Sequence, residues 1–235
     1  MKEEAHPSRA DTEEGLNYPL AVAYYARLRF IVNLLPLLRN ATDLRRVVSV
    51  FAGTKEGTIN TNDFQGRNGS MLSLRGQFSS MMTLALEAVA KNAPNVSFIH
   101  VYPGFVKTNI GNDLKGPMFT VLRAVFNVIY PVIGPLLATP VDEAGERHLF
   151  IATSARFPEG GESAATGVPG PKGVTVARGT DGESGSGVYS IANDGESAPH
   201  QVEQLLGRLR EDGTAQKVWS QVEEEFVRVT GTASL

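Results

Sequence analysis

The sequence predicts an α/β fold, in which helices flank a parallel β-sheet, and two observations support this class. Short apolar runs rich in β-branched residues alternate along the chain with longer segments of helical periodicity. The short runs have the composition expected of parallel strands that are buried on both faces. A chain of 235 residues is long enough for one domain with a substantial hydrophobic core.

The first half of the chain contains four expected elements. Residues 20–38 have apolar side chains at helical spacing, and Pro36 is expected to bend or end this helix. A strand is expected at 46–53, a second helix at 72–91 and a second strand at 96–102. The strand–helix–strand order predicts that the two strands are parallel.

The second half of the chain is less regular. The segment 139–142 supplies a capping threonine, a first-turn proline and an acidic residue, so a helix is expected from here to about residue 153. Residues 157–187 are rich in Gly, Pro, Ser and Glu and are expected to form a long flexible loop. One more strand at 187–193 and two amphipathic helices complete the expected order.

These elements divide the chain into two parts. Residues 1–16 are polar and acidic and are expected to form a disordered tail, whereas residues 17–235 are expected to form a single domain. The tail does not have the apolar stretch of a signal peptide, so a cytoplasmic location is expected.

The composition excludes several classes of function. The formal net charge of −3 provides no general attraction to nucleic acid or to an anionic membrane. The chain has no cysteine, which excludes disulfides and thiolate catalysis. Its four histidines are scattered without the spacing of metal ligands, so no metal site is expected.

The segment 117–138 is strongly apolar but is interrupted by polar residues, prolines and a glycine. A membrane-spanning helix needs about 20 predominantly apolar residues, so no membrane span is expected here. The segment fits either a lid over an apolar ligand pocket or a dimer contact, and the sequence leaves both alternatives open.

The segment 84–108 gives the strongest indication of function. A helix ends, a short strand follows, and the strand leads into Pro103-Gly104-Phe-Val-Lys-Thr108. This Pro-Gly-x-Val-x-Thr pattern resembles the short-chain dehydrogenase/reductase family, and residues 12–193 are most similar to its fungal members tied to secondary metabolism. The resemblance implies a Rossmann-like, doubly wound sheet and an oxidoreductase, in which Pro103, Gly104 and Thr108 occupy cofactor-binding positions beside the nicotinamide.

The resemblance does not extend to the other positions on which the family's chemistry depends. Ala23, Phe51 or Ala52, Ser70 and Leu74 stand where the family has its catalytic Asn, Ser, Tyr and Lys. The family's strand, Gly-rich turn and helix that bind the dinucleotide have no counterpart before the first helix. We therefore expect a partial sheet with its first strands missing, vestigial cofactor positions, and no cofactor; NAD or NADP is expected only if the resemblance outweighs these differences.

Two ionisable residues remain as catalytic candidates. His100 and Tyr102 alternate with apolar residues on the strand that leads to the expected pocket, so both face one side of the sheet. A histidine or tyrosine at that position could act as a general acid or base. The alternative is that one or both are packed core residues with a hydrogen-bond partner.

Two hypotheses of function follow. The first is a tailoring enzyme of secondary metabolism that acts on an apolar terpenoid or polyketide, as an oxidoreductase or, since its redox residues are missing, by cofactor-free cyclisation, isomerisation or dehydration. The second is a non-catalytic truncated remnant or interaction module. The clean apolar stripes of the helices favour the enzyme, and an uncovered sheet edge predicts a homodimer or a partner subunit in either case.

Overall fold

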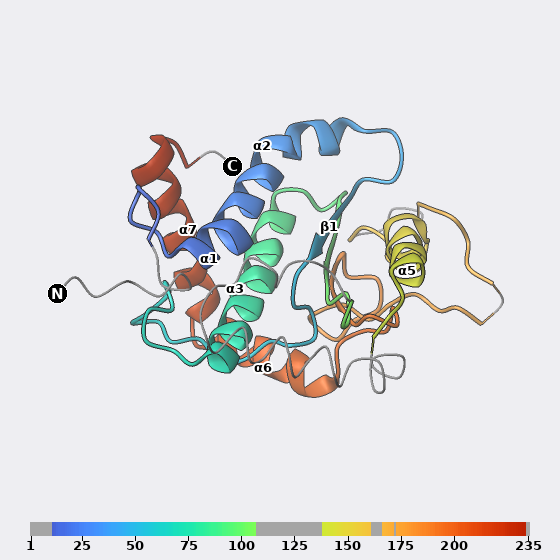
Figure 1. Ribbon diagram of the computed structural model, residues 1–235. Coiled ribbons are helices and arrows are strands. Elements are labelled where there is room, and N and C mark those ends of the chain that lie inside the picture. The colour runs from blue at the N-terminus through green and yellow to red at the C-terminus, as the bar shows by residue number, and fades with distance from the viewer. Residues whose placement is uncertain (1–10, 107–137, 161–165, 172, 234–235) are drawn as a thin grey trace.

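Three parallel strands form one open sheet. The central strand β2 (Ser97–Val101) pairs with β1 (Arg46–Val50) on one side and with β3 (Val188–Ile191) on the other, and Val48 is aligned with Ile99 in the β1–β2 register. The computed structural model describes residues 11–106, 138–160, 166–171 and 173–233 (Figure 1).

Among the described residues, one long helix and four separate helices surround the sheet. The long helix is continuous through three parts, which are α1 (Tyr18–Leu20), the π-helical η2 (Ala21–Tyr25) and α2 (Ala26–Asn40). The separate helices are α3 (Met71–Lys91), α5 (Val141–Thr153), α6 (His200–Glu211) and α7 (Thr214–Thr230). Each helix expected from the sequence is present.

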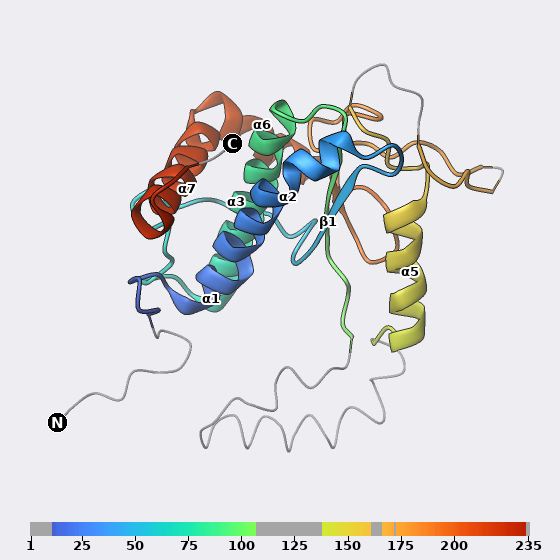
Figure 2. The same ribbon diagram turned by 90° about the horizontal axis from the view of Figure 1, so that it is seen from above.

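The helices cover both faces of the sheet. α2, α3 and α7 lie on one side of it and α5 lies on the other, and the two perpendicular views agree on this arrangement (Figures 1 and 2). The fold is therefore α/β, with an open parallel sheet flanked by helices, as predicted. It is consistent with part of a Rossmann-like fold.

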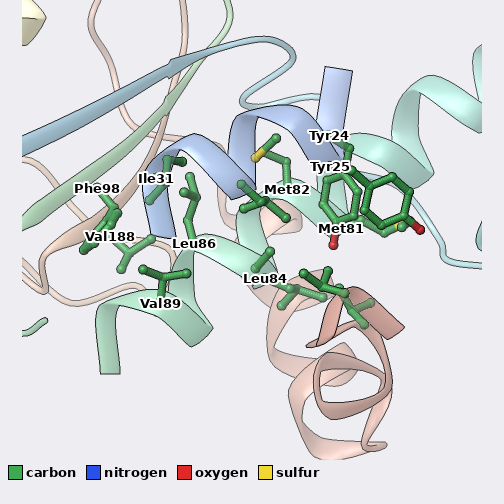
Figure 3. Packing of buried hydrophobic residues seen from close by; sticks show 14 of the residues in the cluster. Tyr24, Tyr25, Ile31, Met81, Met82, Leu84, Leu86, Val89, Phe98 and Val188 are labelled. Carbon is green, nitrogen blue, oxygen red and sulfur yellow. The ribbon is translucent and has the colours of Figure 1, made fainter. Parts of the chain in front are cut away.

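Successive residues of the sheet enter two separate cores, as the alternation of side chains along a strand requires. Phe98 and Val188 face α3 and belong to the larger core, where they pack with residues of the long helix and of α3 such as Ile31, Leu86 and Val89 (Figure 3). The smaller core lies on the α5 side of the sheet and contains Ile99, Val101, Ile151, Phe157, Ala177, Tyr189 and Ile191.

Three details differ from the sequence prediction. Pro36 does not end its helix, and α2 continues past it to Asn40. The neighbouring Leu35 is buried in the larger core. β1 ends at Val50 instead of residue 53, because the chain turns there to cross the end of the sheet. The helix expected to start at Thr139 begins at Val141.

The described parts of the expected tail (11–16) and of the expected loop (157–160, 166–171 and 173–187) are more closely attached to the domain than their composition indicates. Within 11–16, Leu16 is buried and Asp11 forms an ion pair with Arg67 at 2.7 Å. Phe157 and Ala177, from the loop expected at 157–187, are buried in the smaller core. Apolar side chains in a polar segment therefore anchor both segments to the domain.

One helix of the described chain, Tyr18–Asn40, is long and apolar enough to cross a membrane by length and composition alone. Leu28, Ile31 and Leu35 of this helix are buried in the larger core. The core helix of a water-soluble protein meets the same criterion, so the observation is weak evidence for insertion into a membrane.

Candidate functional site

The three parallel strands end at one edge of the sheet. Ligands of open α/β sheets bind outside the carboxyl ends of the strands, so this edge is the candidate functional site. We define the carboxyl edge as residues 51–57 after β1, 102–104 after β2, and 192–193 after β3. Its described residues form two layers, a buried polar cluster and an outer aromatic side chain beside two cations.

The loop after β1 crosses directly over the ends of the other two strands. A Cβ atom at Gly53 would lie 2.2 Å from the backbone oxygen of His100 and 3.0 Å from that of Ile191, so only glycine fits here. The next residue, Thr54, has φ of 65°, a conformation that β-branched residues rarely adopt. Its N–H group donates to Ser190 Oγ at 2.7 Å, which helps to hold this conformation.

Glu56 turns inward from this loop and lies between α3 and the sheet, with its side chain fully buried. Its Oε1 atom accepts hydrogen bonds from Thr83 Oγ1 and from Ser190 Oγ, each at 2.7 Å. Thr83 Oγ1 also lies 2.8 Å from His100 Nδ1. We call Glu56, Thr83, His100 and Ser190 the buried polar cluster.

The hydrogen bonds of His100 indicate its tautomer. The Ala52 N–H group donates to Nε2 at 3.1 Å, so in the neutral ring Nδ1 carries the proton and donates to Thr83. The Thr83 hydroxyl can then donate to Glu56. Burial is the main reason why the pKa of His100 falls to about 3, and it also raises the pKa of Glu56, against which the hydrogen bonds from Ser190 and Thr83 act.

The outer layer of the site is centred on Tyr102, which follows β2 and is half-buried. The Lys55 Nζ atom lies 5.0 Å from the centre of its ring, and the Arg75 Cζ atom lies 5.1 Å from the same point. Both distances are within the range of cation–π attraction. The two cations therefore fix the ring at the rim of the sheet.

A contact between two glycines brings these cations together. The Gly57 N–H group donates to the Gly76 backbone oxygen at 3.0 Å, and a Cβ atom at Gly76 would lie 3.1 Å from Gly57 Cα. The Ser80 hydroxyl of α3 donates to the Gly57 oxygen at 2.6 Å. Because the loop lies directly on α3, Lys55 in the loop and Arg75 on the helix reach the same ring.

His100 and Tyr102 both lie on the α3 side of the sheet, in line with their alternation in the sequence. They occupy different layers, however. His100 is enclosed and uses both ring nitrogens within the protein, whereas Tyr102 reaches the rim. Their catalytic role remains a prediction.

The family positions are only partly described. Pro103 and Gly104 follow β2, and Gly104 has φ of 80°, with a Cβ atom there lying 3.0 Å from the Asn193 side chain. This is the tight turn that the resemblance implies. Thr108 and residues 117–137, which include nearly all of the expected lid, lie outside the described residues.

We tested whether the described residues fit a nicotinamide dinucleotide. α3 contains no tyrosine, and its one lysine, Lys91, lies in the last turn, so this helix does not carry a Tyr-x-x-x-Lys pair. The connections that follow β1 and β3 in the described chain, 51–70 and 192–199, are not short Gly-rich turns of the kind that cradle a pyrophosphate. These residues do not fit the cofactor, and no hydride step is derived through them.

A cleft of about 380 Å³ lies at the opposite edge of the sheet, where Val96 and Gly187 precede β2 and β3. It is lined in part by Glu87 and Arg210, which form an ion pair at 2.9 Å. This is not the apolar cavity expected at the carboxyl ends. That cavity was expected beneath residues 117–138 and stays a prediction, because most of this cover is outside the described chain.

The sequence did not single out Lys55, Glu56, Thr83 or Arg75. The first two belong to the polar segment 54–68, which composition marks only as turns. The one available signal was the position of Lys55 and Glu56, two and three residues after the glycine that closes the expected strand, since ligands of parallel sheets bind there.

The fold and the site together define an α/β protein with an open Rossmann-like sheet and polar side chains at its carboxyl edge. No protein-family model matches the chain. The chain is 40% identical over 217 residues to an oxidoreductase of Emericella nidulans, covering 92% of this chain and 63% of the relative.

Two further relatives are similar over nearly the same stretch. The NmrA-like family domain-containing oxidoreductase notO of an Aspergillus species is 34% identical over 94% of this chain and 61% of the relative. The short-chain dehydrogenase/reductase SAT2 of Stachybotrys chartarum is 30% identical over 88% of this chain and 58% of the relative. The chain thus spans about three fifths of the length of these relatives, and the likeness supports a fungal, short-chain-dehydrogenase/reductase-like oxidoreductase family.

Proposed function

We propose that the protein is an oxidoreductase-like tailoring enzyme of secondary metabolism, and that it binds an apolar small molecule such as a terpenoid or polyketide at its carboxyl edge. The observation that carries this proposal is Tyr102, a half-buried phenol that contacts both Lys55 and Arg75 where parallel sheets bind ligands. The names of the fungal relatives support an oxidoreductase-like chain. The substrate class and the reaction are our inference.

The proposed chemistry is a cofactor-free isomerisation, cyclisation or dehydration. The first two keep every atom of the substrate, and the third releases one water, so none needs an oxidant or a reductant. In this scheme Tyr102 is the general acid, and its hydroxyl donates a proton to the reacting oxygen of the substrate. It is the one residue of the scheme that has to contact the substrate. His100 and Glu56 are positioning residues, because they hold the loop that carries Lys55.

We expect turnover without added cofactor. In a mass-spectrometric assay with apolar terpenoids and polyketides, the product should have the mass of the substrate or that mass less one water, and NAD or NADP should change nothing. Tyr102→Phe should lower turnover by about 10²–10⁴-fold, the usual range for a general acid, without changing the melting temperature. Tyr18→Phe, at an exposed tyrosine of α1, is the matched control.

Two results would contradict this scheme. A product that differs from the substrate by two hydrogens and forms only with NAD or NADP would replace the non-redox reaction by the family's hydride transfer. Full turnover of Tyr102→Phe would remove the assigned proton donor. His100→Ala should lower turnover and melting temperature together, because His100 is a buried structural link.

A second candidate function, an interaction module, is favoured by a stripe of exposed apolar residues on the long helix. Phe30 and Leu37 are each 70% exposed, and the stripe recurs at helical spacing. Its members are Tyr18, Val22, Phe30, Leu34 and Leu37. A stripe of this kind is typical of helices that pack against a partner, and we propose self-association through it.

Sedimentation velocity tests this second function. The protein should sediment as a dimer at micromolar concentration, and Phe30→Ser with Leu37→Ser should convert it to a monomer, because the apolar contact is lost. Leu149→Ser, at an exposed leucine of α5, is the control and should leave the dimer intact. A monomeric wild-type protein would contradict the interaction module but not the enzyme.

A further inference from the structure

Lys55 and Arg75 share one aromatic partner, the ring of Tyr102. Seven described arginines pair with carboxylates, namely Arg45, Arg67, Arg147, Arg156, Arg178, Arg210 and Arg228. Within the described residues, neither Lys55 nor Arg75 has a carboxylate at ion-pair distance; each contacts the ring of Tyr102 instead. In the part of the chain that the structure describes, two positive charges therefore meet at one ring without a negative partner.

The backbone holds the two charges in place. Gly53 presses the loop onto the sheet, and the Gly57–Gly76 contact presses it onto α3, so neither Lys55 nor Arg75 can separate from the other by a rigid movement of the loop. Since both groups lie about 5 Å from the same ring centre, their separation cannot exceed the sum of those two distances. Both charges therefore lie beside one ring, and an oxyanion at this ring would meet the positive field of both.

Glu56 follows Lys55 directly in the chain, but it does not neutralise this pair. Its side chain is fully buried beneath the loop, and its Oε1 atom is engaged by Thr83 and Ser190. Burial, the largest influence, raises the pKa of Glu56 and favours its neutral form, although Lys55 acts in the opposite direction. The positive field of Lys55 and Arg75 thus faces the rim of the sheet.

We propose that Lys55, Arg75 and Tyr102 form an oxyanion subsite that holds a carboxylate or phosphate group of a small-molecule ligand at the carboxyl edge. Lysine supplies a compact charge and arginine a planar fork that matches an oxyanion, so together they bind such a group by charge-assisted hydrogen bonds. The ring of Tyr102 offers an apolar surface to the neighbouring carbon atoms. This inference rests on the proposed function and narrows its substrate class to apolar acids.

Calorimetric titration with three eight-carbon probes tests the subsite. Octanoate and octyl phosphate carry the oxyanion, and 1-octanol is the neutral control of equal chain length. At least one of the two anions should bind tenfold or more tightly than octanol, and its binding should weaken as salt is added. The tighter of the two anions identifies the source of the oxyanion as a carboxylate or a phosphate.

Charge-removing variants locate the binding. Lys55→Gln and Arg75→Gln should each weaken binding of the anion about tenfold or more, as expected for loss of a charge-assisted hydrogen bond, and weaken binding of octanol much less. Lys217→Gln, at an exposed lysine of α7, should have no effect. Unchanged melting temperatures show that each variant is folded.

Three outcomes would overturn the subsite. If octanol binds as tightly as the anions, or if the two variants keep full affinity for the anion, the carboxyl edge binds apolar molecules without recognising an oxyanion, and the proposed function survives. If none of the three probes binds, the oxyanion subsite is wrong. The product assay described above, which does not use these probes, then decides separately on the proposed function.

Discussion

Gly53→Ala is expected to lower the free energy of unfolding by about 3 kcal/mol or more, the upper range for forcing extra volume into a packed interior. The added methyl group would lie 2.2 Å from the His100 backbone oxygen, 2.8 Å from its carbonyl carbon, and 3.0 Å from the Ile191 oxygen. All three are backbone atoms of the sheet, so no side chain can rotate to make room. Urea denaturation followed by circular dichroism measures the change.

Gly145→Ala is the matched control for this substitution. Gly145 lies within α5, and a Cβ atom there would meet nothing within 4 Å. The same chemical change should stabilise the protein by about 0.5–1 kcal/mol, because alanine is the better helix former. If Gly53→Ala proves as stable as the wild type, the loop does not lie on the strand ends as described, and the geometry of the carboxyl edge is wrong.

The buried polar cluster is expected to make stability depend on pH. The pKa of His100 is about 3 in the folded protein, against an ordinary value of 6.5, so below pH 6.5 the unfolded chain binds a proton that the folded protein does not. The free energy of unfolding contributed by His100 should therefore fall as the pH is lowered from 6.5 towards 3. The full loss amounts to about 5 kcal/mol, at roughly 1.4 kcal/mol for each pH unit.

The titration of Glu56 changes the free energy of unfolding with pH in the opposite direction to that of His100. Glu56 therefore has to be replaced before the contribution of His100 can be measured alone. Its pKa is raised in the folded protein from 4.5, and its contribution is present at low pH and lost as the pH rises through the folded value. Glu56→Gln retains an oxygen that can accept from Thr83 and Ser190 but does not titrate. In this variant the free energy of unfolding should still fall as the pH is lowered, because His100 is present. The double variant that also contains His100→Gln should no longer show this part of the fall.

The difference between these two profiles is the measurement, because exposed carboxylates contribute equally to both. Denaturation midpoints at intervals from pH 7 to pH 4 suffice to define the slope. Two superimposable profiles would show that His100 titrates alike in the folded and unfolded chains, which would contradict its burial in a neutral form.

The sequence predicted the elements well and the site poorly, for physical reasons. α3 was anticipated within one residue at its start because 21 residues of helical periodicity form a strong local signal. The position of Tyr102 at the end of a strand was anticipated within one residue, because strand ends are local features; its catalytic role stays a prediction. Of the two effects expected of Pro36, a bend or an end of the helix, the end does not occur, and the burial of Leu35 that accompanies the continuation depends on the rest of the fold.

The partners of the site residues depend on contacts between distant parts of the chain. Glu56 and Ser190 are separated by 134 positions, and only the parallel pairing of the strands brings them together. In the sequence, Glu56 is one charged residue in a polar loop, for which exposure to solvent is the usual expectation. No periodicity or motif marks a carboxyl group that is buried by a later strand.

The contact between Gly57 and Gly76 also determines which positions of this protein are open to change. A side chain at either glycine would push the loop away from α3. Neither glycine can therefore be replaced when the site is changed to bind a new ligand. Positions 55 and 75 project away from this contact and can change identity without disturbing it. Variants of these two positions alone form a small library in which specificity is altered while the scaffold is kept.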